Sequence, residues 1–442
     1  MSAPESDVSG LLRAVSRWQL VGLAINDVVG SGIYLLPAAA AALLGGASVW
    51  AIVLAGLAAA LLVLCFAEAS SYFDQPGGAY LYTREAFGRF VGFEVGWMTW
   101  LSRVAAMASF AEGLVQATTF LWPAAAGHWA RAAIVCGLIL PLAGINVRGV
   151  RAGAHIAVVL VIAKMLPLAF FIAVGVWFVD RSHLAILEAP RGAALGQAAL
   201  LLLFAYGGFE NTPAAAGEYR NPRRNVPFAL LSMILVVTLL YGAVQVVALG
   251  TLPGLARSSS PLADAAERFA GHPGAWLLTL GTMLSIAGIA GNTMLTGPRY
   301  LFALASDGYG PRLLAQVHPK YRTPAVAIVV QAVIALALAM SGSFVQLASL
   351  SVIARVATYI GTAAAVPVLR WRLADRASMR LPLGPAIPIA ALLVATALLG
   401  SATEASLLAV AAALTVGCVI YVISRPGGPR PGSERPGAQA LR

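Results

Sequence analysis

The feature of this sequence that most constrains its fold is a series of long apolar runs. A helix needs about 20 mostly apolar residues to cross the hydrocarbon core of a bilayer, where its backbone groups must bond to one another. The runs predict about twelve such helices, centred on 20–43, 48–72, 90–120, 131–146, 153–178, 195–216, 227–250, 275–303, 324–341, 344–368, 384–401 and 405–423. Because the chain is also 60% hydrophobic and only 11% charged, we expect an all-α integral membrane protein.

The basic residues are distributed unevenly among the predicted loops. The formal net charge of +11 could by itself indicate a nucleic-acid partner. With the N-terminus placed in the cytoplasm, 21 of the 29 Lys and Arg residues fall on the cytoplasmic side, five outside and three within spans. This bias follows the positive-inside rule. The charge therefore predicts topology, with both termini cytoplasmic, and no nucleic-acid partner.

Sequence patterns of enzymes, metal sites and disulfide frameworks are missing from the chain. The histidines lack metal-ligand spacing, the three cysteines fall within spans, and no Walker, HExxH or GxSxG pattern occurs. We expect residues 1–17 to form a cytoplasmic segment without a removable signal peptide, and residues 425–442 to form a disordered cytoplasmic tail. The sequence thus predicts no enzymatic activity, no metal and no cofactor.

Glycine interrupts two of the apolar runs. The sequence GSG at 30–32 breaks the first run and GG at 207–208 breaks the sixth, each with a proline a few residues beyond. Glycine and proline disfavour an uninterrupted helix, although small residues also let membrane helices pack closely. Broken helix at membrane depth is tolerated only where it is buried in protein or lines a cavity, and paired breaks point to a transporter's substrate site. We interpret both as true discontinuities.

Three ionisable residues in the spans are candidates for function, because a charge at the centre of a membrane helix costs about 2.5–3.5 kcal/mol. Lys164 lies mid-span and is a proton carrier, a fixed cation in place of a metal ion, or half of a structural ion pair. Glu210 follows the second break and could be a proton-sensitive gate or tie the loosened backbone to a neighbour. Asp27 could pair with Lys164, contact a cationic part of a substrate or accept hydrogen bonds.

Five other charged residues in or near the spans have a structural interpretation. Arg103 and Glu112 share one span, and each is expected to pair with another helix. Glu68, Glu94 and Arg355 lie nearer to the predicted span ends, where interfacial or interhelical pairing is favoured. We assign none of the five to a substrate site.

Five motifs occur in order along the chain: GSGIY at 30–34, QPGGAY at 75–80, FAYGGFE at 204–210, GE followed by NPRRNVP at 217–227, and RYLFALASDG at 299–308. Together, over Trp18 to Arg372, they resemble the amino acid–polyamine–organocation (APC) superfamily of secondary transporters. The resemblance implies a 5+5 inverted repeat, at 18–178 and 195–370, with discontinuous helices 1 and 6. Two peripheral helices follow at 384–424.

The resemblance also implies a substrate site at the breaks. The substrate-binding residues on the family's pattern are Val28, Gly30, Ser31, Gly32, Ile33, Phe204, Ala205 and Gly207. The half-helix after Gly32 offers unpaired N–H groups and the positive end of its dipole to a carboxylate, which is expected at the backbone of residues 31–33. The half-helices that end before the breaks offer carbonyls to an ammonium group, expected near Val28, Phe204 and Gly207.

Coupling and gating residues follow from the same resemblance. Lys164 matches a lysine that in many members replaces a sodium ion and would face Ser285 in the eighth span, which favours proton coupling or ion-independent exchange over sodium coupling. The gating or pocket candidates are Asp27, Tyr206, Glu210, Asn292 and Thr293. Asp27 departs from the Asn, Ser or apolar residue of relatives, and Asn292-Thr293 stands where some arginine exchangers carry a gating tryptophan.

The sequence therefore predicts a secondary active transporter of amino acids in the cytoplasmic (inner) membrane of a bacterium, with proton-coupled symport slightly favoured. An amino acid exchanger and a polyamine or organic-cation transporter that uses Asp27 as counter-charge are alternatives. A transporter-like nutrient sensor ranks lower, because the termini leave no room for a signalling domain. The energy source would be a proton gradient or a counter-substrate. The expected partners are a small amino acid or amine and the lipid bilayer, and the expected state is a monomer or homodimer.

Overall fold

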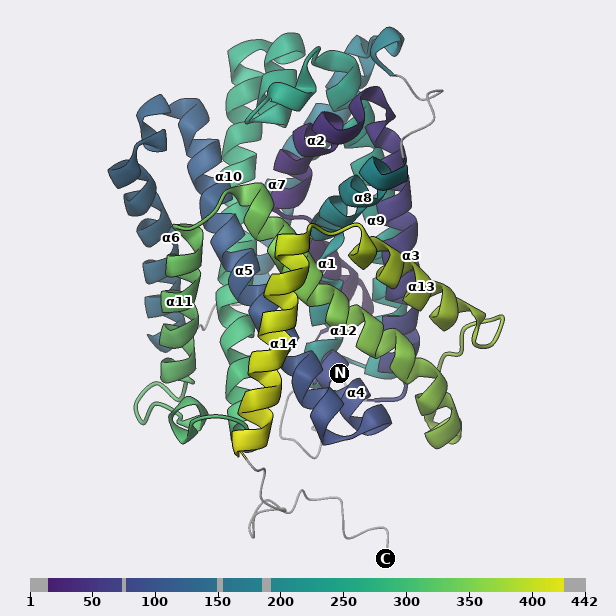
Figure 1. Cartoon of the computed structure of the whole chain (residues 1–442). Coiled ribbons are helices and arrows are strands. Elements are labelled where there is room, and N and C mark those ends of the chain that lie inside the picture. The colour runs from purple at the N-terminus through teal and green to yellow at the C-terminus, as the bar shows by residue number, and fades with distance from the viewer. Residues whose placement is uncertain (1–14, 74–76, 149–153, 185–191, 425–442) are drawn as a thin grey trace, which may run out of the picture.

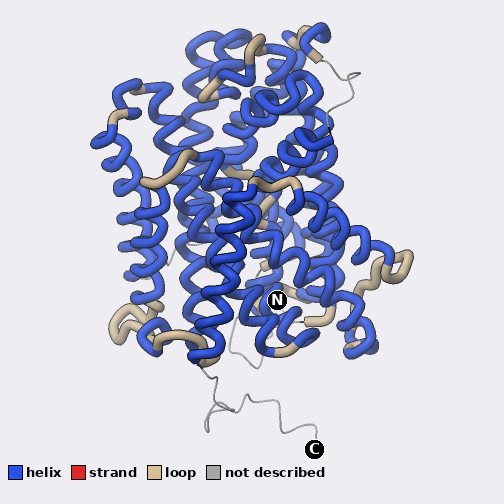
Figure 2. The backbone as a smooth tube through the Cα atoms, viewed as in Figure 1, coloured by secondary structure: helices blue, strands red, loops and turns tan. Residues whose placement is uncertain are grey.

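The computed structural model describes residues 15–73, 77–148, 154–184 and 192–424, which are almost entirely helical (Figures 1 and 2). Within these residues no strand forms, and an isolated bridge joins Val15 to Tyr219. Most of the predicted segment 1–17 and the whole predicted tail 425–442 lie outside the described residues. The all-α prediction is confirmed.

The helices coincide with the predicted apolar runs. They are α1 (Arg17–Val28), α2 (Ser31–Leu44), α3 (Ser48–Ser71), α5 (Arg89–Leu121), α6 (His128–Arg148), α7 (Ala154–Gly175), α8 (Gly192–Tyr206), α9 (Pro222–Thr251), α10 (Pro261–Ser306), α11 (Ala325–Ala339), α12 (Phe344–Arg372), α13 (Ala386–Gly400) and α14 (Glu404–Ser424). In the described part of the chain, eight helical stretches are long and apolar enough to cross a membrane, and three shorter apolar helices accompany them. The chain is therefore a multi-span membrane protein.

Two helical segments extend beyond the predicted spans. The short helix α4 (Gly78–Phe87) connects α3 to α5 and was not predicted as a separate element. The helix α10 starts well before the predicted run and is kinked at Gly271, whose φ of 63° lies in the left-handed region that favours glycine. Residues 261–270 thus form a separate helical segment ahead of the span.

Both predicted discontinuities are present. Between α1 and α2 the helix stops at Val28 and restarts at Ser31, two residues earlier than expected. Between α8 and the 3₁₀ segment η5 (Phe209–Glu218) the break lies at residues 207–208, and Gly208 has a φ of 129°. A Cβ at Gly208 would overlap the carbonyl oxygen of Asp27, so the backbones of the two breaks are in direct contact. Glycine at position 208 therefore permits both the positive φ of the break and the close approach of the two backbones.

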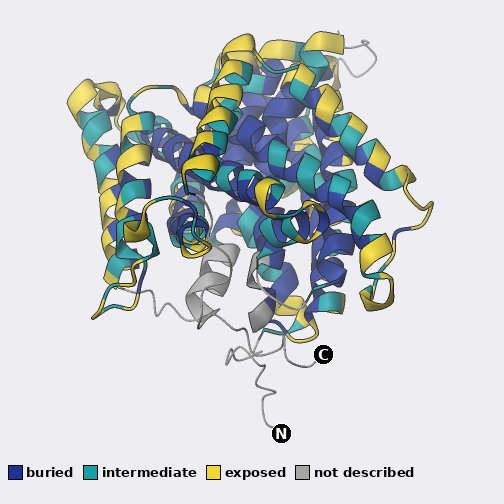
Figure 3. Ribbon diagram, turned by 60° about the horizontal axis from the view of Figure 1, so that its bottom comes forward, coloured by how far each residue is buried: buried dark blue, intermediate teal, exposed yellow. Residues whose placement is uncertain are grey.

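The two breaks lie at the centre of the molecule. The helix α5 packs against α10 and α12, and α3 packs against α9 and against the broken helix α8, so that long helices enclose the broken ones. Figure 3 shows buried residues inside and exposed residues outside. The outward faces carry exposed leucines such as Leu239 and Leu408, as expected for contact with lipid. The helices α13 and α14 pack on the outside, against α12 (Figure 1). The inverted-repeat division at 18–178 and 195–370 stays a prediction.

Candidate functional site

A small cavity lies between the two helix breaks. Its free volume is about 10 Å³, about the space of one water molecule. It is lined by Asp27, Val28, Gly30, Ser31, Gly32, Arg103, Phe110, Phe204, Ala205, Gly207, Gly208, Asn211, Ile289, Asn292, Thr293 and Arg355. The structure therefore holds the site in a closed form, and a substrate can occupy it only after lining side chains move.

Most of the residues predicted for the site line this cavity. Of the predicted substrate-binding residues, only Ile33 is outside the lining. The gating candidates Tyr206 and Glu210 are not among the lining residues, and neither are the coupling candidates Lys164 and Ser285. The structure thus brings the glycine motifs of the first and second breaks to one cavity. The roles predicted for the individual residues stay predictions.

The first turn of α2 presents hydrogen-bond donors to the cavity. The N-cap residue Gly30 has no side chain to bond to the free N–H groups of residues 31–33. The hydroxyl of Ser31 is fully buried and has no hydrogen-bond partner among the described residues. The positive end of the α2 dipole lies at the same point. This combination suits an anionic group such as a carboxylate.

The carbonyl groups at the breaks are held by a tyrosine that the sequence analysis did not identify. The Tyr241 hydroxyl in α9 is 2.9 Å from the carbonyl oxygen of Ala205 and 3.2 Å from that of Val28, so it bridges the two broken helices. Each carbonyl oxygen keeps a second lone pair for another donor. The signal in the sequence that could have identified this residue was a tyrosine hydroxyl in the middle of the apolar run 227–250.

Lys164 bonds to the carbonyl end of α1. Its Nζ donates to the carbonyl oxygens of Asn26 and Val29, the latter at 2.8 Å, and the side chain is 2% exposed. Within the described residues no carboxylate lies within ion-pair distance of Lys164. Its interpretation as half of a structural ion pair is therefore wrong in this structure. The expected partner Ser285 is buried in α10, but no hydrogen bond joins it to Lys164.

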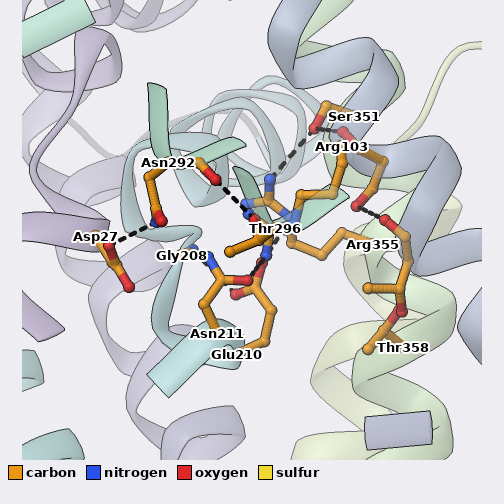
Figure 4. A network of polar contacts seen from close by, with 12 residues as sticks. Asp27, Arg103, Gly208, Glu210, Asn211, Asn292, Thr296, Ser351, Arg355 and Thr358 are labelled. Atoms are coloured by element: carbon orange, nitrogen blue, oxygen red, sulfur yellow. Dashed lines mark hydrogen bonds and ion pairs between the residues drawn. The ribbon is translucent and has the colours of Figure 1, made fainter. Parts of the chain in front are cut away.

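Asp27 faces the cavity from the end of α1. Its Oδ1 accepts a hydrogen bond of 2.8 Å from Nδ2 of Asn292, which lies on α10 (Figure 4). The expected alternative of a pair with Lys164 is not formed. Because Asp27 is only partly buried, its end of the cavity is the more open one. The carboxylate retains acceptor positions for a cationic group.

Glu210 is the centre of a buried ion network. Its Oε1 lies 3.0 Å from Nη2 of Arg103 and 3.2 Å from Nε of Arg355 (Figure 4). Its Oε2 accepts the N–H of Gly208 at 2.9 Å, and the Tyr359 hydroxyl lies 3.4 Å away. The carboxylate thus ties the second break to α5 and α12, in agreement with the structural interpretation of Glu210.

The other charges are paired as expected, with one exception. Glu112 pairs with Arg131 at 2.9 Å, and Glu68 pairs with Arg370 at 2.6 Å. The carboxylate of Glu94 packs against α14 beside Gly417 and the thiol of Cys418, and it forms no ion pair in the described part of the chain.

Arginines are the main component of the cavity that the sequence analysis missed. Arg103 and Arg355 are 3% and 4% exposed, and both belong to the lining. The interfacial alternative for Arg355 is wrong, because α12 continues to Arg372 and places the residue mid-helix. Also missed were Phe110, Asn211 and Ile289, whereas Gly208 was predicted as part of the second break.

The chemistry of the cavity is that of binding. No group of three or more His, Cys, Asp or Glu residues in the described ranges could hold a metal ion. The lining offers backbone N–H and C=O groups, one carboxylate and two guanidinium groups. Such a set recognises a small molecule that carries charges of both signs.

Comparison with known proteins matches residues 15–433 to a family described as amino acid permease. The chain is 30% identical to the methylthioribose transporter of Bacillus subtilis (strain 168), over 87% of each chain. It is 29% identical to the serine/threonine exchanger SteT of the same organism, over 89% of this chain and 92% of the relative. The branched-chain amino acid permease BcaP of B. subtilis is 26% identical over 95% of each chain.

Proposed function

Because the chain belongs to the amino acid permease family, we propose that it is a secondary transporter that carries an amino acid across the membrane by alternating access. The observation that carries the proposal is the pair of helix breaks around one cavity, with the free N–H groups of α2 facing it and carbonyl groups at the ends of α1 and α8. A zwitterion satisfies both sets of backbone groups. Relatives named for serine, threonine and branched-chain amino acids support this substrate class.

Proton-coupled symport is the coupling mode that we favour. Lys164 supports it, because its buried ammonium group, which has no carboxylate partner among the described residues, bonds directly to the carbonyls of the first break. Loss of its proton would weaken the hold on α1 and thereby link protonation to the shape of the site. Amino acid exchange is the alternative, and the relative named as a serine/threonine exchanger favours it.

The cellular setting completes the proposal. Because the basic residues concentrate on one side of the membrane, the protein would lie in a bacterial inner membrane with both termini in the cytoplasm. It would act as a monomer or homodimer, would catalyse no chemical reaction and would need no bound cofactor. A proton gradient or a counter-substrate would supply the energy.

Transport by the purified full chain in liposomes tests the function. Labelled amino acid should accumulate when the proton gradient is directed inward, and should not accumulate in liposomes without protein. Accumulation that requires preloaded amino acid and ignores the pH gradient would establish exchange instead.

A thermal-shift screen identifies the substrate class, since a ligand stabilises the folded protein according to the occupancy of its site. The screen should contain amino acids, putrescine and methylthioribose, the last because one relative is named for it. Stabilisation by putrescine or methylthioribose alone, without any amino acid, would overturn the proposed function.

A further inference from the structure

The buried end of the cavity carries an excess of positive charge. Two guanidinium groups, of Arg103 and Arg355, share the single carboxylate of Glu210, which leaves a formal charge of +1 (two cations minus one anion). All three side chains are at most 5% exposed. The remaining charged groups at the breaks, Lys164 and Asp27, offset each other in formal charge. A buried net charge costs several kcal/mol unless a counter-ion joins it.

The two guanidinium groups also keep unused hydrogen-bond donors. Nε of Arg103 has no hydrogen-bond partner among the described residues. Nε of Arg355 lies 3.2 Å from Glu210 but outside hydrogen-bond geometry, and it too has no partner there. An arginine carries five N–H donors in a planar fork that matches a carboxylate. Buried donors of this kind are normally satisfied.

The arginines belong to the cavity and do not lie behind it. Both line it, and a Cβ at Gly207 would overlap Nη1 of Arg355, so this guanidinium occupies the space beside the second break. In Figure 4, Asp27 and Asn292 lie on one side of Gly208, and Arg103 and Arg355 lie on the other. The cavity is therefore polarised, with a carboxylate at one end and two cations at the other.

We propose that Arg103 and Arg355 form a subsite for an anionic side chain, and that the substrate is an acidic amino acid. This inference rests on the proposed function, because the α2 N-terminus would take the α-carboxylate and Asp27 would face the ammonium group. The side-chain carboxylate then reaches the guanidinium pair and neutralises the +1 charge. A neutral amino acid would leave that charge and both Nε donors unsatisfied.

The test compares ligands that differ in charge and not in size. Affinities of the purified full chain for glutamate and aspartate are compared with those for glutamine and asparagine. They are measured by thermal shift and by how strongly each unlabelled ligand inhibits uptake of a labelled amino acid. We expect at least one acidic amino acid to bind about tenfold or more tightly than its amide, because hydrogen bonds to a charged group are roughly twice as strong as neutral ones. Glutarate, which lacks the ammonium group, should compete more weakly than glutamate.

Variants assign the preference to the two arginines. In Arg103→Gln and Arg355→Gln the ratio of glutamate to glutamine affinity should fall toward one. Arg370→Gln is the matched control, because Arg370 lies on the same helix as Arg355 and pairs with Glu68 away from the cavity. It should keep the wild-type ratio.

The outcomes separate this inference from the proposed function. If neutral amino acids bind and the acidic ones bind no better than their amides, the arginines only join helices and the inference is wrong while the transporter stands. If glutarate equals glutamate, the substrate is a dicarboxylate and the inference is also wrong. If no amino acid binds, the proposed function itself fails. Because the wild-type ratio decides, a variant that fails to fold does not affect the test.

Discussion

At the scale of single residues, the side chains and the backbone at the breaks have separate tasks. The backbone of α2 supplies N–H groups, whereas Ser31 adds a buried hydroxyl that bonds to nothing in the described residues. A buried hydroxyl without a partner costs about 1–3 kcal/mol. A residue that lowers stability in the empty protein is a candidate for contact with a ligand.

Ser31→Ala should therefore affect binding more than folding. We expect the unfolding temperature of the ligand-free variant to be equal to or above that of the wild type, and amino acid affinity to fall by about 5- to 13-fold, for a lost hydrogen bond of about 1–1.5 kcal/mol. Thermal unfolding with and without amino acid measures both quantities. Thr362→Val is the control, because Thr362 is also buried without a partner in the described chain but lies outside the cavity lining. Equal effects of both variants on affinity would contradict the prediction.

Lys164→Ala should remove the dependence of transport on the proton gradient. Under the proposed symport, wild-type uptake rises as the pH outside is lowered relative to the lumen, because the site takes up a proton with its substrate. The variant has no titrating group on the carbonyls of Asn26 and Val29, so its uptake should be flat with pH. Lys320→Ala, in an exposed loop, is the control and should keep the wild-type profile. A variant whose pH profile is unchanged excludes Lys164 from coupling.

At the scale of elements, the second break depends on a glycine that no other residue can replace. Gly208 has a φ of 129°, and a Cβ at this position would overlap the carbonyl oxygen of Asp27, which is backbone and cannot rotate away. The break and the contact between the two broken helices thus require the same residue.

Gly208→Ala should destabilise the fold by about 2–6 kcal/mol, from backbone strain of about 1–3 kcal/mol and overpacking of about 1–3 kcal/mol. Gly242→Ala is the matched control, since its Cβ would meet nothing within 4 Å in the middle of α9, and alanine favours a helix. Unfolding temperature and yield of monodisperse protein measure the difference. If both variants are equally stable, the contact between the breaks does not limit stability.

The elements were largely predictable from sequence, and the site only in part. Apolar runs and glycine motifs placed the helices and both breaks, since the bilayer imposes these patterns on any spanning chain. The arginine subsite was missed because Arg355 was placed near a span end, whereas α12 extends to Arg372. The bonds of Tyr241 to Val28 and Ala205 were beyond prediction, because they join α9 to two distant breaks and depend on the packed structure.

At the scale of the whole molecule, transport requires that the closed cavity open, and we expect polar contacts at one end of the helices to oppose this. Arg84 in α4 pairs with Asp307, just beyond α10, at 2.8 Å, and the Tyr80 hydroxyl also bonds to Asp307. Burial raises the pKa of Tyr80, with a further contribution from its hydrogen bond to Asp307, so the hydroxyl stays a neutral donor. This group of residues, on the side that the positive-inside rule places in the cytoplasm, ties α4 to α10.

Asp307→Asn should shift the molecule toward a state open to the cytoplasm. The Arg84–Asp307 pair is about 30% exposed on each side, and partly exposed ion pairs contribute about 0.2–1 kcal/mol, so we expect an effect of about 1.4- to 5-fold. Opening is reported by the rate at which a thiol reagent labels a cysteine introduced by Thr293→Cys, at a buried position in the cavity lining. The three native cysteines are first replaced, so that only this thiol reacts: Cys65, Cys136 and Cys418. Glu267→Gln is the control, because Glu267 forms a surface pair with His272 away from α4. A labelling rate from the cytoplasmic side that rises in Asp307→Asn and not in Glu267→Gln would identify the contact as part of the gate. Equal rates in all three proteins would mean that opening breaks other contacts.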